Sequence, residues 1–138
     1  MRLVLDTNIL ISALIRESIT RKILVMSGIE FLVPEFTFEE IDKHKKQILK
    51  KSKLNASQFD FLMMSLKENL TIIPKYEIRK IKQAKEIMDK IDPNDTVFIS
   101  LALSTFNDGI WSDDIHFKKQ NVVKVWNTKE LIEFLLQK

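Results

Sequence analysis

The sequence contains no cysteine, and only two of its 138 residues are glycine. Without cysteine the chain can form no disulfide, no thiolate zinc site and no cysteine nucleophile, and this suits the reducing cytoplasm. The scarcity of glycine, together with 45% hydrophobic and 30% charged residues, excludes collagen-like and disordered compositions. The length is typical of one domain, and we expect a single domain over residues 1–138.

Long hydrophobic runs are missing as well. The longest apolar stretch runs from Ile9 to Ile15, is interrupted by Ser12, and is far too short to cross a bilayer. No positively charged leader precedes a cleavable apolar segment. We therefore expect a soluble, cytoplasmic protein with no membrane partner.

Short apolar runs alternate along the chain with amphipathic segments, and most of the runs are apolar on both faces, as in the buried strands of a parallel sheet. Strands are predicted at residues 3–5, 31–33, 70–73, 110–111 and 122–125. Helices are predicted at residues 38–48, 56–66, 78–91 and 95–106, with two successive helices over 35–68 and a last helix capped by Thr128. The alternation predicts a three-layer α/β/α domain with a central parallel sheet of about five strands.

Acidic residues stand where ligands bind in such a fold, just beyond the carboxyl ends of the strands. They are Asp6, Glu39, Glu40, Asp92, Asp95, Asp113 and Asp114. Helix capping alone explains each one taken singly, and Asp92 with Pro93 is typical of a helix start. Several converging carboxylates, however, repel each other unless a cation neutralises them. With no cysteine and only two histidines, their oxygens favour a hard ion such as Mg²⁺ or Mn²⁺.

Four segments of the chain carry a family resemblance. In order they are LVLDTNILISAL, FEEI after the second predicted strand, DPNDTVFISLAL and GIWSDDIHF. Together they span nearly the whole chain and resemble the PIN domain family of nucleases. The resemblance implies a parallel α/β/α fold and an endoribonuclease that cleaves single-stranded RNA by a water activated with Mg²⁺ or Mn²⁺. It leaves open whether the chain is the toxin of a toxin–antitoxin pair, with an antitoxin protein as partner, and whether it forms a homodimer.

By position, the four acids of the family fall on Asp6, Glu40, Asp95 and Asp114. The resemblance implies that the three aspartates hold the metal, whereas Glu40 either completes the metal site or orients the attacking water. Asn8 and Ser112 would hydrogen-bond the carboxylates. Because Asp113 is also acidic, the fourth acid of the family is either Asp113 or Asp114. The complete set of acids favours an active enzyme over the alternative, a non-catalytic nucleic-acid-binding or interaction module on the same fold.

Lysines crowd between residues 43 and 53, although the net charge of the chain is only +3. Lys43, Lys46 and Lys50 share one side of the predicted helix that begins at the acidic site, so either they contact RNA phosphates or they form a solvated face. His44 lies one helical turn past Glu40 and could face the same cleft. We expect His116 beside the site or at the surface rather than in the chemistry.

Overall fold

Five short segments of the chain pair as strands of one sheet. In the computed structural model, which describes residues 1–137, they are β1 (Arg2–Leu5), β2 (Glu30–Pro34), β3 (Leu70–Ile73), β4 (Ile110–Trp111) and β5 (Val125–Trp126). Every neighbouring pair is parallel, and the order across the sheet is β3-β2-β1-β4-β5. The predicted parallel sheet of five strands is confirmed.

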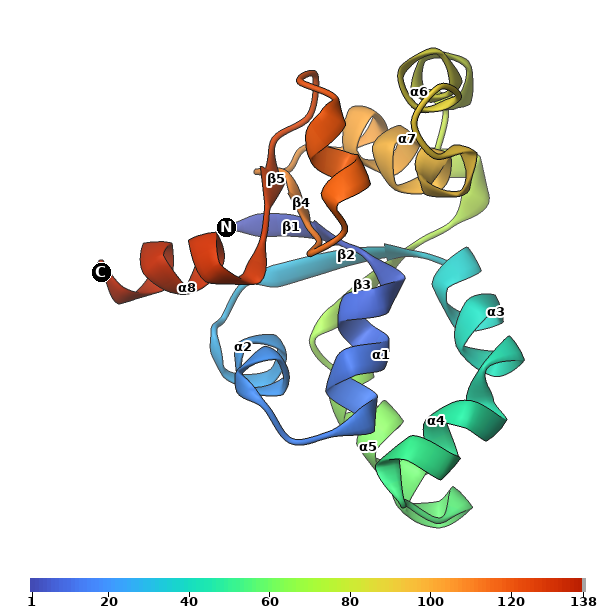
Figure 1. Ribbon diagram of the computed structural model, residues 1–138, viewed down its shortest axis with the longest axis vertical. Helices are drawn as coiled ribbons and strands as arrows, with labels where there is room; N and C mark the ends of the chain where they lie inside the picture. The colour runs from blue at the N-terminus through green and yellow to red at the C-terminus, as the bar shows by residue number, and fades with distance from the viewer. Residues whose placement is uncertain (138) are drawn as a thin grey trace.

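Helices cover both faces of this sheet (Figure 1). They are α1 (Thr7–Ile15), α2 (Ile19–Met26), α3 (Phe36–Lys43), α4 (Lys45–Ser52), α5 (Ala56–Lys67), α6 (Ile81–Met88), α7 (Thr96–Ser104) and α8 (Thr128–Leu136). None of these helices, in the part of the chain that the structure describes, is long and apolar enough to span a membrane.

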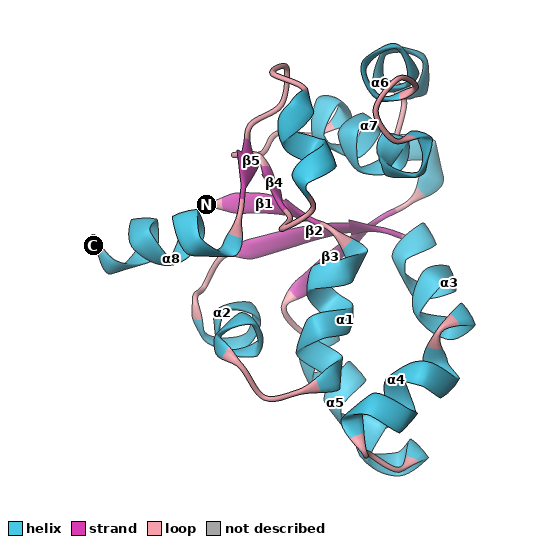
Figure 2. Cartoon of the chain, viewed as in Figure 1, coloured by secondary structure: helices cyan, strands magenta, loops and turns pink. Residues whose placement is uncertain are grey.

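Successive residues of β1 supply two separate cores, because side chains alternate across a strand. Leu3 and Leu5 pack in one core with residues of α1, α2 and α5, whereas Val4 packs in the other with residues of α6 and α7. Figure 1 and Figure 2 show these two groups of helices on opposite sides of the sheet. The three-layer α/β/α arrangement is therefore confirmed.

The segment 35–68 forms three helices rather than the two that the sequence predicts. α3 ends at Lys43 and α4 begins at Lys45, since His44 between them has φ −103° and ψ 9°, outside the helical region. α5 begins after Asn55, whose side chain accepts a hydrogen bond from Gln58 N in a capping box. The prediction of one continuous helix across 38–48 is wrong.

The last strand begins three residues later than predicted. The Gln120 side chain accepts hydrogen bonds from Val122 N and Val123 N and donates one to Val123 O, so these backbone groups are satisfied without a neighbouring strand. The start of α8 also differs, because Asn127 and not Thr128 caps the helix by accepting from Glu130 N.

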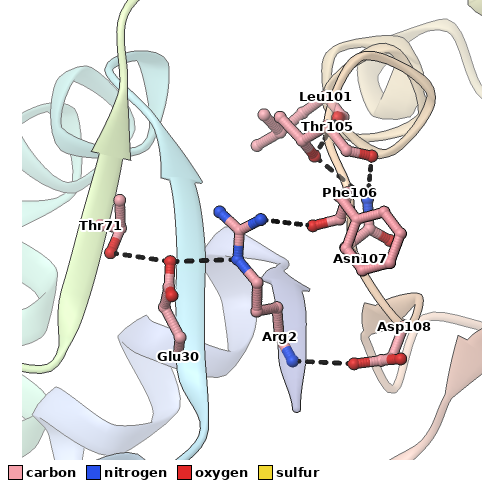
Figure 3. Close-up of polar contacts among 8 residues, drawn as sticks. All are labelled: Arg2, Glu30, Thr71, Leu101, Thr105, Phe106, Asn107 and Asp108. Carbon is pink, nitrogen blue, oxygen red and sulfur yellow. Dashed lines mark hydrogen bonds and ion pairs between the residues drawn. The ribbon is translucent and has the colours of Figure 1, made fainter.

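A network of polar contacts joins the amino ends of β1 and β2 to the segment that precedes β4 (Figure 3). Arg2 Nε donates to Glu30 Oε2 at 3.1 Å, and Arg2 Nη1 donates to Phe106 O at 2.7 Å. The backbone N of Arg2 donates to Asp108 Oδ2 at 2.9 Å. Both carboxylates at this edge therefore accept hydrogen bonds from Arg2.

Candidate metal centre

Asp6 lies at the carboxyl end of β1, where the order of the strands reverses. The chain runs from β1 to β2 and β3 on one side and then returns to β4 and β5 on the other, so the ends of β1 and β4 form a topological switch point. Asp6 N donates to Trp111 O at 3.1 Å, which fixes the two strand ends side by side. The Asp6 side chain is therefore held in the crevice where this kind of sheet binds ligands, and the residue is only 3% exposed.

Ser112 joins Asp6 to the next acidic residue of the site. Its hydroxyl donates to Asp6 Oδ2 at 2.7 Å and accepts from Asp114 N at 3.0 Å. Asp114 in turn caps a short 3₁₀ helix, η3 (Ile115–Lys119), by accepting from the N–H of its second residue at 2.9 Å. Asp113 instead accepts from Thr128 N and Thr128 Oγ1, both at 2.6 Å. Asp113 therefore hydrogen-bonds to the start of α8, whereas Asp114 lies in the site.

Asp95 enters the site from the start of α7. Asp92 and Pro93 begin the 3₁₀ turn η2 (Pro93–Asp95), and the Asp92 side chain accepts from Asn94 N at 3.0 Å. Asp95 is 9% exposed, and its Oδ2 is buried with no hydrogen-bond partner among the described residues. A buried carboxylate oxygen without a donor is costly, so this atom indicates that a positively charged ligand belongs beside it.

Asp95 is one of four residues whose potential ligand atoms all lie within 4.8 Å of one another, the others being Asp92, Asp114 and His116. His116 Nδ1 is 3.0 Å from Asp114 Oδ1 and 3.6 Å from Asp92 Oδ2. Three carboxylates and an imidazole are donors that suit a divalent cation. Together with the unpartnered oxygen of Asp95, this donor set fits a metal ion.

The pKa values of the buried aspartates reflect the same crowding of negative charge. Burial, and then the charges of Asp92, Asp114 and Asp6, raise the pKa of Asp95 to about 7. Burial also raises the pKa of Asp6, against the hydrogen bonds from Ser112 and Asn8, and the charge of Asp114 adds to the rise. Asp6, predicted as a metal ligand, is not one of the four residues of the cluster, but its charge acts on Asp95, and a cation in the cluster would relieve the repulsion.

A family model described as PIN domain matches residues 4–136 of the chain. The chain belongs to the PIN domain family. No curated protein matches it. PIN domains are generally nucleases that typically use a divalent metal, so family membership and the acidic cluster point to the same kind of chemistry.

Two residues of this PIN domain's cluster are not among the acids that the sequence predicts for the site. Asp92 stands among the acids at the carboxyl edge but is interpreted as a helix cap, and it does cap η2 while also lying in the cluster. His116 is expected beside the site, and its side chain is 41% exposed, yet its Nδ1 is buried against two carboxylates. The spacing of Asp92 from Asp95, and of His116 from Asp114, is the sequence signal, but a cap shows the same spacing.

Glu40 stands apart from the aspartates of the PIN domain's cluster. It lies on α3, partly exposed, with its Oε2 3.8 Å from His44 Nε2, and no described contact joins it to the aspartates. A buried contact of 3.1 Å between Thr7 Oγ1 and Thr37 Oγ1 holds α3 against α1, and Glu40 follows Thr37 by one helical turn. The hydrogen bond from Asn8 to Asp6 Oδ1, at 3.4 Å, comes from the backbone N–H, so the predicted role of the Asn8 side chain stays a prediction.

The three lysines named as possible RNA contacts do not share a helix. Lys43 is the last residue of α3, whereas Lys46 and Lys50 belong to α4. The break at His44 removes the regular spacing that would place all three on one face. The prediction of a single lysine stripe leading from the site is therefore wrong.

Proposed function

We propose that this PIN domain is an endoribonuclease that cleaves single-stranded RNA with Mg²⁺ or Mn²⁺. The observation that carries the proposal is the buried, unpartnered Oδ2 of Asp95 within a cluster of three carboxylates and an imidazole. Family membership supports nuclease chemistry, and the acidic cluster supports a metal. The choice of single-stranded RNA rests on the sequence resemblance.

The residues that would hold the ion are Asp92, Asp95, Asp114 and His116. A bound divalent ion supplies a grip on the scissile phosphate and lowers the pKa of the attacking water. Ser112 keeps Asp6 and the backbone of Asp114 in place through its two hydrogen bonds. Asp6 adds negative charge next to Asp95 and so strengthens the attraction for a cation.

Glu40 has a separate role in this proposal. Its carboxylate lies outside the group of close ligand atoms and pairs with His44. Of the two roles that the resemblance leaves open, we therefore assign it the positioning of the attacking water rather than the holding of the ion.

Cleavage assays on purified protein test the proposal. We expect single-stranded RNA to be cut in the presence of Mn²⁺ or Mg²⁺ and cutting to stop when EDTA is added, because the chain has no cysteine nucleophile and its acids need a cation. Asp6→Asn and Asp95→Asn should each slow cleavage by about two orders of magnitude, the scale of losing a key electrostatic group.

The matched control for these variants is Asp89→Asn. This exposed residue directly follows α6, lies outside the cluster, and should be dispensable for cleavage. Undiminished cleavage in EDTA, or a fully active Asp95→Asn, would contradict the metal mechanism. RNA binding by the wild type without any cleavage would favour the non-catalytic alternative. Single-stranded DNA and duplex RNA, assayed in parallel, test the substrate class.

The toxin of a toxin–antitoxin pair is the biological role that the resemblance suggests. A short neighbouring reading frame that encodes a DNA-binding antitoxin, and growth arrest relieved by its co-expression, would support that role.

A further inference from the structure

We infer that a groove between α1 and α4 guides the RNA strand to the candidate metal centre, and that Arg16 and Lys51 contact its phosphates there. The inference rests on the proposed function, since it names the path of the same substrate. It also replaces the predicted lysine stripe with two cations that the fold brings together from separate helices.

The groove consists of two adjoining hollows of about 440 Å³ and 190 Å³. Both are lined by Asn8, Ile11, Ile15 and Lys51, so they form one continuous depression. Asn8, Ile11 and Ile15 recur at helical spacing along α1, and His44, which precedes α4, is followed at the same spacing by Gln47 and Lys51 of α4. The facing sides of two helices thus form the walls, with isoleucine side chains between them.

One end of the groove comes close to Asp6, which borders the candidate metal centre. Asn8 is the residue whose N–H donates to Asp6 Oδ1, and His44 is the residue whose Nε2 lies 3.8 Å from Glu40. From Asn8 the groove follows α1 to Arg16, a length of about 12 Å at about 1.5 Å per helical residue. A stacked strand advances about 3.4 Å per nucleotide, so the groove is long enough for several phosphates next to the scissile one.

The charge of the groove suits a polyanion. None of the described residues that line it is acidic, whereas Arg16 and Lys51 both line it and are exposed. Neither side chain makes a hydrogen bond or an ion pair with any residue that the structure describes, so both cations are available to phosphates. Isoleucine walls add apolar surface on which the faces of unpaired bases can rest.

The other hollow near the site has a different charge. It measures about 540 Å³ and lies between the end of β2 and α6, where Lys75 pairs with Glu39 at 3.8 Å. Glu35 also lines it, so its two lysines face two carboxylates. Of the two hollows, the groove along α1 and α4 is therefore the one that attracts a nucleic acid backbone.

Charge reversal at matched positions tests the path. Arg16→Glu and Lys51→Glu are compared with Lys46→Glu and Lys50→Glu, which change the net charge equally on exposed positions outside the groove. All are made in an Asp95→Asn background, and binding of a fluorescent single-stranded RNA is followed by anisotropy over a NaCl series. Far-UV circular dichroism and thermal melts verify that each variant is folded.

We expect each groove variant to bind about tenfold more weakly or worse, and the slope of log K against log salt to become shallower by about 0.7 for each phosphate that the variant no longer neutralises. Lys51→Arg should bind as wild type, because it keeps the charge. Lys46→Glu and Lys50→Glu should stay within about twofold of the parent, since their interactions with the phosphates would be only long-range. Equal weakening in Lys50→Glu and Lys51→Glu, or unchanged binding in both groove variants, would overturn the inference.

Cleavage of the same RNA by the wild-type protein with Mn²⁺ separates this inference from the proposed function. Cleavage with no difference between groove and control variants overturns the groove alone. The expected binding pattern without cleavage overturns the nuclease and keeps the groove as the site of a non-catalytic RNA-binding protein.

Discussion

At the scale of single residues, the carboxyl of Asp95 controls how the site responds to pH. Its pKa of about 7 in the folded protein lies above the ordinary value of 3.8, mainly because of burial and then because of its acidic neighbours. The folded protein therefore binds more protons than the unfolded chain between about pH 4 and pH 7. It follows that the free energy of unfolding of the metal-free protein falls as the pH rises through this window, and Asp6 contributes with the same sign.

Asp95→Asn removes this titration, because an amide stays neutral. We expect metal-free Asp95→Asn to melt close to wild type at about pH 4 and above wild type at about pH 8. Thermal melts in EDTA across this pH range measure the difference. Asp89→Asn serves as the exposed control and should follow wild type throughout. A difference between Asp95→Asn and wild type that does not change with pH would exclude Asp95 as the titrating group.

Some residues of the site could be predicted from the sequence, and others could not, for physical reasons. Asp6 and Asp114 could be placed because each closely follows a strand, and parallel strands end at one edge of the sheet. Asp92 could not be separated from an ordinary helix cap, because its capping role fully explains its position next to Pro93. Asp113 and Asp114 follow the same strand, and only the hydrogen bonds of Asp113 with Thr128, 15 residues further along, separate them.

At the scale of elements, these hydrogen bonds attach the start of α8 to the end of β4. Asp113 accepts from both Thr128 N and Thr128 Oγ1, and Trp111 Nε1 also donates to Thr128 Oγ1 at 3.0 Å. We expect Asp113→Ala to lower the free energy of unfolding by about 1 kcal/mol, the scale of a missing cap or hydrogen bond, and to leave cleavage close to wild type.

Asp114→Asn should show the opposite pattern, with cleavage abolished and stability kept, because asparagine can still cap η3. Urea denaturation and RNA cleavage on the same protein samples measure both effects. Equal loss of cleavage in Asp113→Ala and Asp114→Asn would show that α8, and not the acid itself, organises the site.

Element boundaries were predictable only where the pattern is local. The helix stripe over 56–66 is confirmed as α5, since a capping box starts it and its spacing is regular. The break at His44 was not predictable, because it depends on the backbone conformation of that residue. The late start of β5 was not predictable either, because it depends on hydrogen bonds to the side chain of Gln120. The break at His44 separates Lys43 from Lys46 and Lys50, and so changes which cations can line one groove.

At the scale of the whole molecule, alternating strands and helices were enough to predict the layers and the parallel sheet. The order β3-β2-β1-β4-β5 was not predictable, because every strand is short and apolar and the sequence does not say which ones are neighbours. That order is what places the end of β1 beside the end of β4. Each element contributes only one or two acids to the candidate site, and the topology of the sheet brings them together.

Binding of a metal at this shared site should therefore stabilise the entire domain. A cation that binds the folded protein and not the unfolded chain raises the melting temperature. At a hundred times its dissociation constant the gain in the free energy of unfolding is about 2.7 kcal/mol, which corresponds to several degrees.

Asp6→Asn should melt at or above wild type without metal, because it removes a buried charge that its neighbours repel, yet its melting temperature should rise much less with Mn²⁺. Glu40→Gln should keep the full Mn²⁺ response while losing cleavage, since Glu40 lies outside the cluster and, unlike Asp6, is not among the charges that raise the pKa of Asp95. Thermal melts of the three proteins over a Mn²⁺ series measure how much each melting temperature rises with the ion. An identical response in wild type and Asp6→Asn would show that the charge of Asp6 does not strengthen metal binding, and a blunted response in Glu40→Gln would make Glu40 a ligand.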